Sequence, residues 1–175
     1  MPTKNHLISI QEAQKPSRLI YRNLMKEATT VPENLRIQWQ RELQMESEIS
    51  EATLNKTFNA IYISSISTRL RSFQYQLLHR CLGINNKLHQ WGIKETSMCD
   101  LCSKETETYI HLFCHCEKVQ AVWRIMSQWT QQTTGNVLET TPVTIIMGTL
   151  NSPVLDTIIT CTILYIYASK MEGHT

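Results

Sequence analysis

Apolar residues recur every three or four positions along most of this chain, and that spacing predicts helices. The first predicted helix opens at Pro16–Ser17, the second after Pro32 and the third near Ser50. Their apolar faces consist of Ile20, Tyr21, Leu24, Met25 and Ala28, then Leu35, Trp39 and Leu43, then Leu54, Phe58, Ile61 and Tyr62. Residues 1–15 show no such periodicity, and we expect a disordered leader there.

The most regular helical pattern lies between residues 65 and 83. Its apolar side consists of Ile66, Leu70, Phe73, Leu77 and Cys81. Either Ser65 or Ser67 suits the N-cap position, and Gly83 is expected to end the helix. A short helical turn over 86–91 follows and ends at Gly92, which leaves Trp91 as the tryptophan most exposed to solvent.

Helical spacing returns in the last third of the chain. Val119, Val122, Met126 and Trp129 predict one helix, and residues 142–147 a short apolar turn. The length of the apolar run 154–168 favours a helix, whereas its isoleucine and threonine content favours a strand. With 15 residues and Asp156 within it, this run is expected to be too short to span a bilayer. With only five glycines and five prolines, the whole chain is expected to be an all-α protein.

Composition narrows the class of protein further. A chain of 175 residues with 42% hydrophobic and 18% charged residues is typical of one globular domain. The N-terminus lacks an apolar signal sequence, so we expect a soluble protein of the cytoplasm and nucleus, with no membrane partner. Four of the six cysteines crowd into residues 99–116, which favours metal binding over a disulfide framework. The other two, Cys81 and Cys161, are expected to be small buried hydrophobic residues.

The crowded cysteines form a C-x2-C-x8-H-x4-C motif from Cys99, Cys102, His111 and Cys116. Three thiolates and one imidazole suit a tetrahedral Zn²⁺ site of the Cys₃His type. Four protein ligands leave no open coordination position, so the predicted zinc is structural. Cys114 and His115 are alternative ligands that the spacing alone does not exclude.

A second feature of the sequence is its uneven charge. No acidic residue occurs between Glu51 and Glu95, and this interval carries six lysines and arginines. Such a block is typical of a surface that contacts phosphates, although clustering of ordinary solvated side chains is the simpler alternative. The predicted nucleic-acid contacts are Arg69, Arg71, Arg80 and Lys87. On a continuous helix, Arg69 and Arg80 would share one side.

Signs of catalysis are lacking in the sequence. The glycine-rich phosphate-binding motifs, the G-x-S-x-G motif and the H-E-x-x-H motif do not occur. The two aspartates, Asp100 and Asp156, are too far apart in sequence to indicate a two-metal carboxylate site. A Cys114–His115 nucleophile pair is a weak hypothesis beside a zinc motif. We therefore expect no enzyme activity and no small-molecule substrate.

Several segments together resemble the reverse transcriptase zinc-binding domain of LINE-type (non-LTR) retrotransposon proteins. The strings that carry the resemblance are Ile20–Leu24, Trp39–Leu43, Ser65–Arg80, Asn86–Gly92, Cys99–Cys102, Glu107–Phe113, Cys116 and Trp123. The resemblance implies the same zinc ligands, Cys99, Cys102, His111 and Cys116. It also implies a role in binding template RNA or target DNA beside the polymerase region of a retrotransposon protein. The Tyr-x-Asp-Asp motif of such polymerases is not present in this sequence.

The sequence thus predicts a small helical domain with an embedded Cys₃His zinc knuckle that binds nucleic acid, RNA before DNA. Its expected parts are the leader 1–15, a helical segment 16–95 with the basic block, the knuckle and following helix 96–132, and a C-terminal helical tail 133–175. A protein-interaction or structural zinc module, or an inactive relic of a mobile element, is the alternative.

Overall fold

The computed structural model describes residues 33–44, 49–63, 67–149 and 151–172. Its helices are α2 (Glu33–Glu42), α3 (Glu51–Ile63), α4 (Thr68–Leu78), α5 (Asn85–Gln90), α6 (Glu117–Thr134), α7 (Pro142–Met147) and α8 (Pro153–Glu172), with a π-helical turn, η2, over His111–His115. Within these ranges there is no strand, only an isolated antiparallel bridge between Met98 and Thr106. The predicted all-α class is confirmed. The leader and the helix expected after Pro16 lie outside the described residues.

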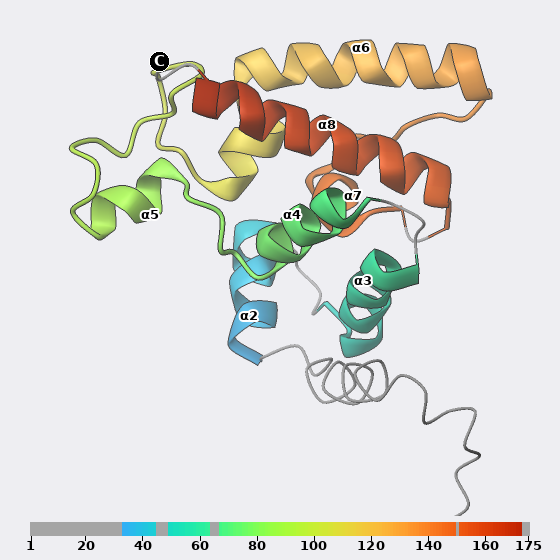
Figure 1. The fold of residues 1–175 in the computed structure, drawn as a ribbon, viewed down its shortest axis with the longest axis horizontal. Helices are drawn as coiled ribbons and strands as arrows, with labels where there is room; N and C mark the ends of the chain where they lie inside the picture. The colour runs from blue at the N-terminus through green and yellow to red at the C-terminus, as the bar shows by residue number, and fades with distance from the viewer. Residues whose placement is uncertain (1–32, 45–48, 64–66, 150, 173–175) are drawn as a thin grey trace, which may run out of the picture.

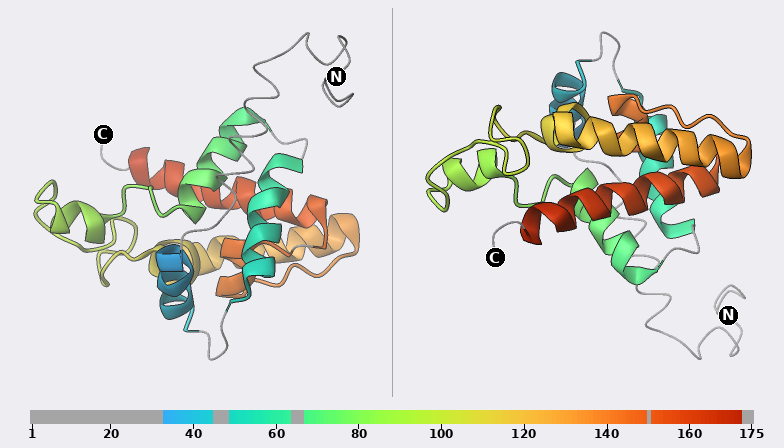
Figure 2. Two further views of the ribbon diagram at one scale, coloured as in Figure 1. Left: turned by 90° about the horizontal axis from the view of Figure 1, so that it is seen from below. Right: turned by 90° about the horizontal axis from the view of Figure 1, so that it is seen from above.

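The two longest helices, α6 and α8, run side by side in one layer (Figures 1 and 2). On the other side of the molecule lie α2, α3 and α4, and α8 packs against α4. The short helix α5 projects from this body together with the cysteine-rich loop. The C-terminal helices α7 and α8 share one hydrophobic core with the predicted helical segment.

Helix starts follow the predicted capping chemistry. Ser67 caps α4, because its hydroxyl oxygen accepts a hydrogen bond from the backbone N–H of Leu70. The Ser50 hydroxyl likewise accepts from the N–H of Thr53 at 3.0 Å and begins α3. These contacts satisfy N–H groups that lack a partner within the first helical turn.

The predicted end of α4 at Gly83 is wrong, since the helix stops at Leu78. Arg80 then adopts the left-handed backbone conformation, with φ of 57°. This reversal allows Leu82 and Ile84 to enter the core, where they are 3% and 2% exposed. Two predictions fail as a result: Cys81 is exposed rather than part of a buried stripe, and Arg80 does not lie on the same helix as Arg69.

The core forms where α2 meets the segment that follows the cysteine-rich loop. Trp39 is fully buried, and its indole N–H donates to the carbonyl oxygen of Leu78 at 2.9 Å. Its ring packs edge-on against Tyr109, with centroids 5.6 Å apart. The Tyr109 hydroxyl donates to Leu82 at 3.0 Å. The buried polar groups of Trp39 and Tyr109 thus find partners, and α2, α4 and the segment around Tyr109 are joined.

The apolar run near the C-terminus forms a helix, α8, and not a strand. The argument that it is too short to cross a membrane is wrong, because α8 extends over 20 residues. By length and composition alone it is the one helix among the described residues that meets the criteria for a membrane span, which is weak evidence. In the structure its inner face, which includes Leu155, Ile159, Ile163 and Ile166, is part of the core.

Candidate metal centre

The first two cysteines of the motif lie on a tight turn between two short paired segments. The backbone N–H of Cys99 donates to the carbonyl of Glu105, and that of Glu107 donates to Ser97, both at 2.8 Å. Between them, the N–H of Ser103 donates to the carbonyl of Cys99, and Ser103 has a positive φ of 56°. This reversal brings the side chains of Cys99 and Cys102 to one point.

The other two ligands come from the π-helical turn η2 and the residue after it. In an α-helix, residues five apart differ by roughly 140° in direction. Here the N–H of Cys116 donates to the carbonyl of His111 at 2.8 Å, which is an i to i+5 bond. The wider turn brings His111 and Cys116 to the same side. Thr108 caps the start of this segment by accepting from the N–H of His111 at 3.0 Å.

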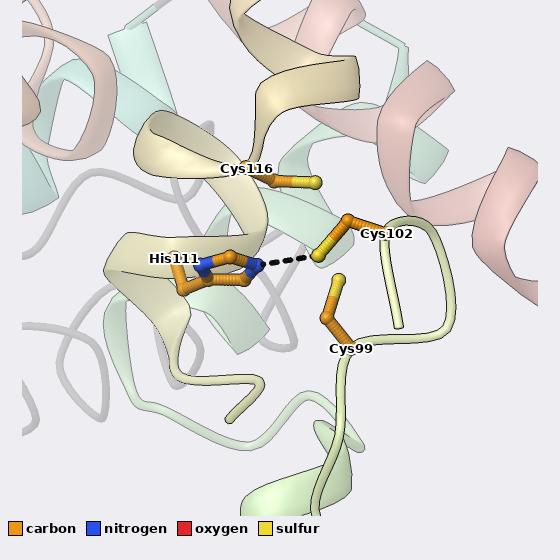
Figure 3. A group of neighbouring side chains, drawn as sticks. All are labelled: Cys99, Cys102, His111 and Cys116. Carbon is orange, nitrogen blue, oxygen red and sulfur yellow. Dashed lines mark hydrogen bonds between the residues drawn. The ribbon is translucent and has the colours of Figure 1, made fainter. Parts of the chain in front are cut away.

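All four predicted metal ligands converge (Figure 3). The sulfur atoms of Cys99, Cys102 and Cys116 and a ring nitrogen of His111 lie within 4.8 Å of one another. The Nε2 atom of His111 is 3.3 Å from the Cys102 sulfur. Cys99, His111 and Cys116 are buried, and Cys102 is partly buried.

This donor set fits zinc. Ligand atoms around a tetrahedral zinc lie about 3.5 to 4 Å apart, so the observed group meets that geometry to within about an ångström. Three sulfurs and one nitrogen are also the ligands that zinc prefers over harder cations. The four residues would occupy the whole coordination sphere, so such an ion would hold the loop and η2 together.

Glu105 contacts one of the four ligands from outside the cluster, and Glu117 ties the same loop to α6. The Nδ1 atom of His111 lies 3.1 Å from a carboxylate oxygen of Glu105, which leaves Nε2 to face the sulfur of Cys102. Lys104, on the same loop, donates to Glu117 of α6 at 2.7 Å. The loop that carries Cys99, Cys102 and Lys104 is therefore joined to α6 by this ion pair, in addition to the ligand cluster.

The ionisation of the thiols depends on their surroundings. Burial raises the pKa of Cys99 to about 12 and also raises that of Cys116. Burial acts in the same direction on Cys102, but hydrogen bonds from the Lys104 backbone N–H and from His111 outweigh it and bring its pKa to about 7. A divalent cation would offset the cost of holding all three thiolates in this buried place.

The two alternative ligands do not belong to the cluster. Cys114 lies in the hydrophobic core at 7% exposure, and burial raises its pKa to about 12. His115 is exposed to solvent. The π-helical turn explains the difference, because it directs His111 and Cys116 toward Cys102 while Cys114 packs inward.

A buried acid beside the knuckle was not identified from the sequence. Glu107 is fully buried and accepts hydrogen bonds from the backbone N–H groups of Asn85 at 2.8 Å and Asp100 at 3.3 Å. The Asn85 side chain in turn donates to the carbonyl of Met98 at 2.7 Å. These bonds fix the first cysteine turn against α5. The sequence signal that could have identified Glu107 is its place at the start of the string Glu107–Phe113, one of those that carry the family resemblance.

Arg80, one of the predicted phosphate contacts, points into the protein. Its guanidinium group forms an ion pair with Glu42 and lies 4.8 Å from the ring centroid of Trp39 and 4.9 Å from that of Tyr109. Its side chain is 15% exposed. These contacts make Arg80 a structural link between α2 and the metal-binding segment.

The other three basic candidates lie nearer the surface. Arg69 is exposed in the first turn of α4, and Arg71 is partly buried. Lys87 is partly buried, donates to the carbonyl of Arg80 and lies 5.2 Å from the ring centroid of Tyr109. The structure therefore does not bring the four basic residues together on one face of a helix.

Residues 16–123 match the protein family described as zinc-binding in reverse transcriptase. This match covers well over half of the chain, and the chain therefore belongs to that family of zinc-binding domains. No curated protein and no solved structure shows significant similarity to it. The matched region is a zinc-binding domain and not a catalytic polymerase domain.

Proposed function

We propose that this chain is a non-catalytic, zinc-holding module of a LINE-type (non-LTR) retrotransposon reverse transcriptase, and that it binds nucleic acid, RNA first. The observation that carries the proposal is the four-ligand Cys₃His cluster in a member of this family. A centre with four protein ligands has no position for a substrate, so its metal contributes to folding and not to a reaction.

The contact surface in this proposal is centred on α4. Arg69 is exposed there, close in sequence to Arg71, within a stretch of the chain that lacks acidic residues. An exposed arginine attracts the phosphates of RNA and DNA alike, although Glu172 of α8 lies in the same surface pocket as Arg69. Arg80 and Lys87 would support it by shaping the adjacent loop. The polymerase region of the same retrotransposon protein would be the neighbour, in the cytoplasm and nucleus.

A salt titration tests the proposal. Binding of the zinc-loaded chain to fluorescent single-stranded RNA should weaken as salt rises, with a slope of roughly −0.7 per phosphate contact in a double-logarithmic plot. Arg69→Glu should lower the affinity and reduce that slope. Arg124→Glu, an exposed change on α6 outside the acid-free segment, is the matched control. Affinity that ignores both salt and the Arg69 change would contradict the proposal.

A protein-interaction module is the second candidate. Trp91 and Ile93, in the projecting segment around α5, are 65% and 67% exposed. The expected exposure of Trp91 is thus confirmed. Large exposed apolar side chains of this kind occur at protein-binding surfaces. Binding of the polymerase region to the Trp91→Ala variant tests this second function. If the variant keeps its RNA affinity but no longer binds the polymerase region, the segment around α5 is a protein-binding surface.

A further inference from the structure

The outer face of α8 is apolar along most of its length. Val154 and Tyr165 are 57% and 64% exposed, and Cys161, which lies between them, is also exposed. Ile158 and Ala168 are partly buried beside them. A soluble domain seldom leaves so continuous an apolar surface open to water, which indicates that something covers it.

The spacing of these residues is that of a helix-packing seam. Positions 154, 158, 161, 165 and 168 alternate steps of four and three residues, the repeat with which one helix packs along another. A different set of side chains on the same helix, which includes Leu155, Ile159 and Ile163, already packs in the core. Of the seam residues, Ile158 also packs against the core, whereas Val154, Cys161 and Tyr165 are exposed and contribute little to holding α8 in place.

The charge of this face restricts its partner. No charged residue occurs between Thr157 and Ser169. At the two ends, the Asp156 carboxylate accepts hydrogen bonds from Thr149, and Lys170 is buried. This stretch of α8 therefore offers no lysine or arginine of its own to a phosphate, and the cation in the pocket at its edge, beside Ala168, is Arg69 of α4. Two identical copies of it, by contrast, meet without like-charge repulsion.

The size of the face suits a dimer. A helix of 20 residues is about 30 Å long. The helix α6 lies beside α8 (Figure 2). Its Ile125 and Trp129 are 64% and 48% exposed. Two helices about 10 Å wide and about 30 Å long offer on the order of 600 Å² per partner, which reaches the lower range of specific interfaces.

We propose that a second copy of this chain covers this face, with α8 packed against α8 of its partner around a two-fold axis. Two-fold symmetry places equivalent patches against each other, so one self-complementary seam suffices. Cys161 is near the middle of α8, and it would lie close to the partner's Cys161 at the axis. The proposal does not depend on nucleic-acid binding.

Sedimentation of the zinc-loaded full chain tests the proposal. The wild type should sediment as a concentration-dependent dimer, and Tyr165→Lys should shift it to the monomer with an unchanged thermal melt. Tyr75→Lys, an exposed tyrosine on α4, is the matched control and should stay dimeric. A wild type that remains monomeric at high micromolar concentration, or a Tyr165→Lys variant that remains dimeric, overturns the proposal.

A thiol cross-link gives a second readout that does not require a disruptive variant. A short bis-maleimide should join two chains of Cys81→Ser, which keeps Cys161, and should fail with Cys161→Ser, which keeps the exposed Cys81. Equal cross-linking of both variants, or of neither, overturns the proposal. A vesicle flotation assay tests the membrane alternative. If the chain is a monomer and co-floats with phosphatidylcholine vesicles, the α8 face contacts membranes and the dimer proposal is overturned.

Discussion

Lys170, near the end of α8, forms an ion pair with Glu107 at the base of the metal-binding loop, and both side chains are almost completely buried. The Lys170 ammonium also donates to the carbonyl of Gly83 at 2.9 Å. Glu107 holds the N–H groups of Asn85 and Asp100. One buried pair thus joins the last helix, α5 and the first cysteine turn, which explains why the domain includes the C-terminal helix.

Removal of one partner of this pair should strongly destabilise the protein. In Lys170→Met, the Glu107 carboxylate stays buried without its cation, which costs about 3 to 5 kcal/mol of unfolding free energy. Urea denaturation of the zinc-loaded chain measures the loss.

The double variant Lys170→Met with Glu107→Gln separates the ion pair from simple packing. Because it removes both charges, its loss should be smaller than the sum of the two single losses. Strictly additive losses would mean that the two side chains do not interact in solution.

The ligand set predicts a sharp difference between two neighbouring cysteines. Cys116→Ser should lose stoichiometric metal, because its sulfur belongs to the cluster. Cys114→Ser should keep the metal and lose only some stability, since its side chain is packed in the core. His115→Ala should also keep it. Metal content after gel filtration measures all three, and metal loss in Cys114→Ser would show that the ligand set is wrong.

Arg80 and Arg69 should respond to mutation in different ways. Arg80→Met takes the cation from the partly buried Glu42 and removes the contacts with Trp39 and Tyr109, so we expect a loss of about 2 to 3 kcal/mol in unfolding free energy. Arg69→Glu is a surface change and should alter stability by less than about 0.5 kcal/mol. Denaturant titration compares the two. Equal stability of both variants would contradict the inward position of Arg80.

Metal removal should first release the turn that carries Cys99 and Cys102 and only then allow the whole domain to unfold. The four ligands join the turn that carries Cys99 and Cys102 to η2, so a chelator should lower the melting temperature and expose Cys99 to alkylation. Added Zn²⁺ should reverse both effects. A melt that is identical with and without chelator would show that the ion does not contribute to folding.

Local pattern was sufficient to predict much of this fold. The Ser67 cap, the burial of Trp39 and the ligand positions follow from spacing over a few residues. Whether the run 154–168 forms a helix or a strand was ambiguous locally, because its composition and its length favour different structures. Packing of its inner face against α4 accounts for the helix.

Contacts between distant residues were beyond the reach of such patterns. A charged residue such as Arg80 is assigned to the surface unless its partner is known, and Glu42 lies 38 residues away. The same holds for Lys170 and Glu107, which are separated by 63 residues. The end of α4 was misplaced for a related reason: the left-handed turn at Arg80 is favoured by burial of the following leucine and not by a glycine.

The metal content of the purified, folded chain tests the central claim most directly. Native mass spectrometry should show one Zn²⁺ per chain, and cobalt substitution should give the absorption of a tetrahedral site with three sulfurs and one nitrogen. A folded chain without bound metal, or a cobalt spectrum with fewer than three thiolate ligands, would contradict the account.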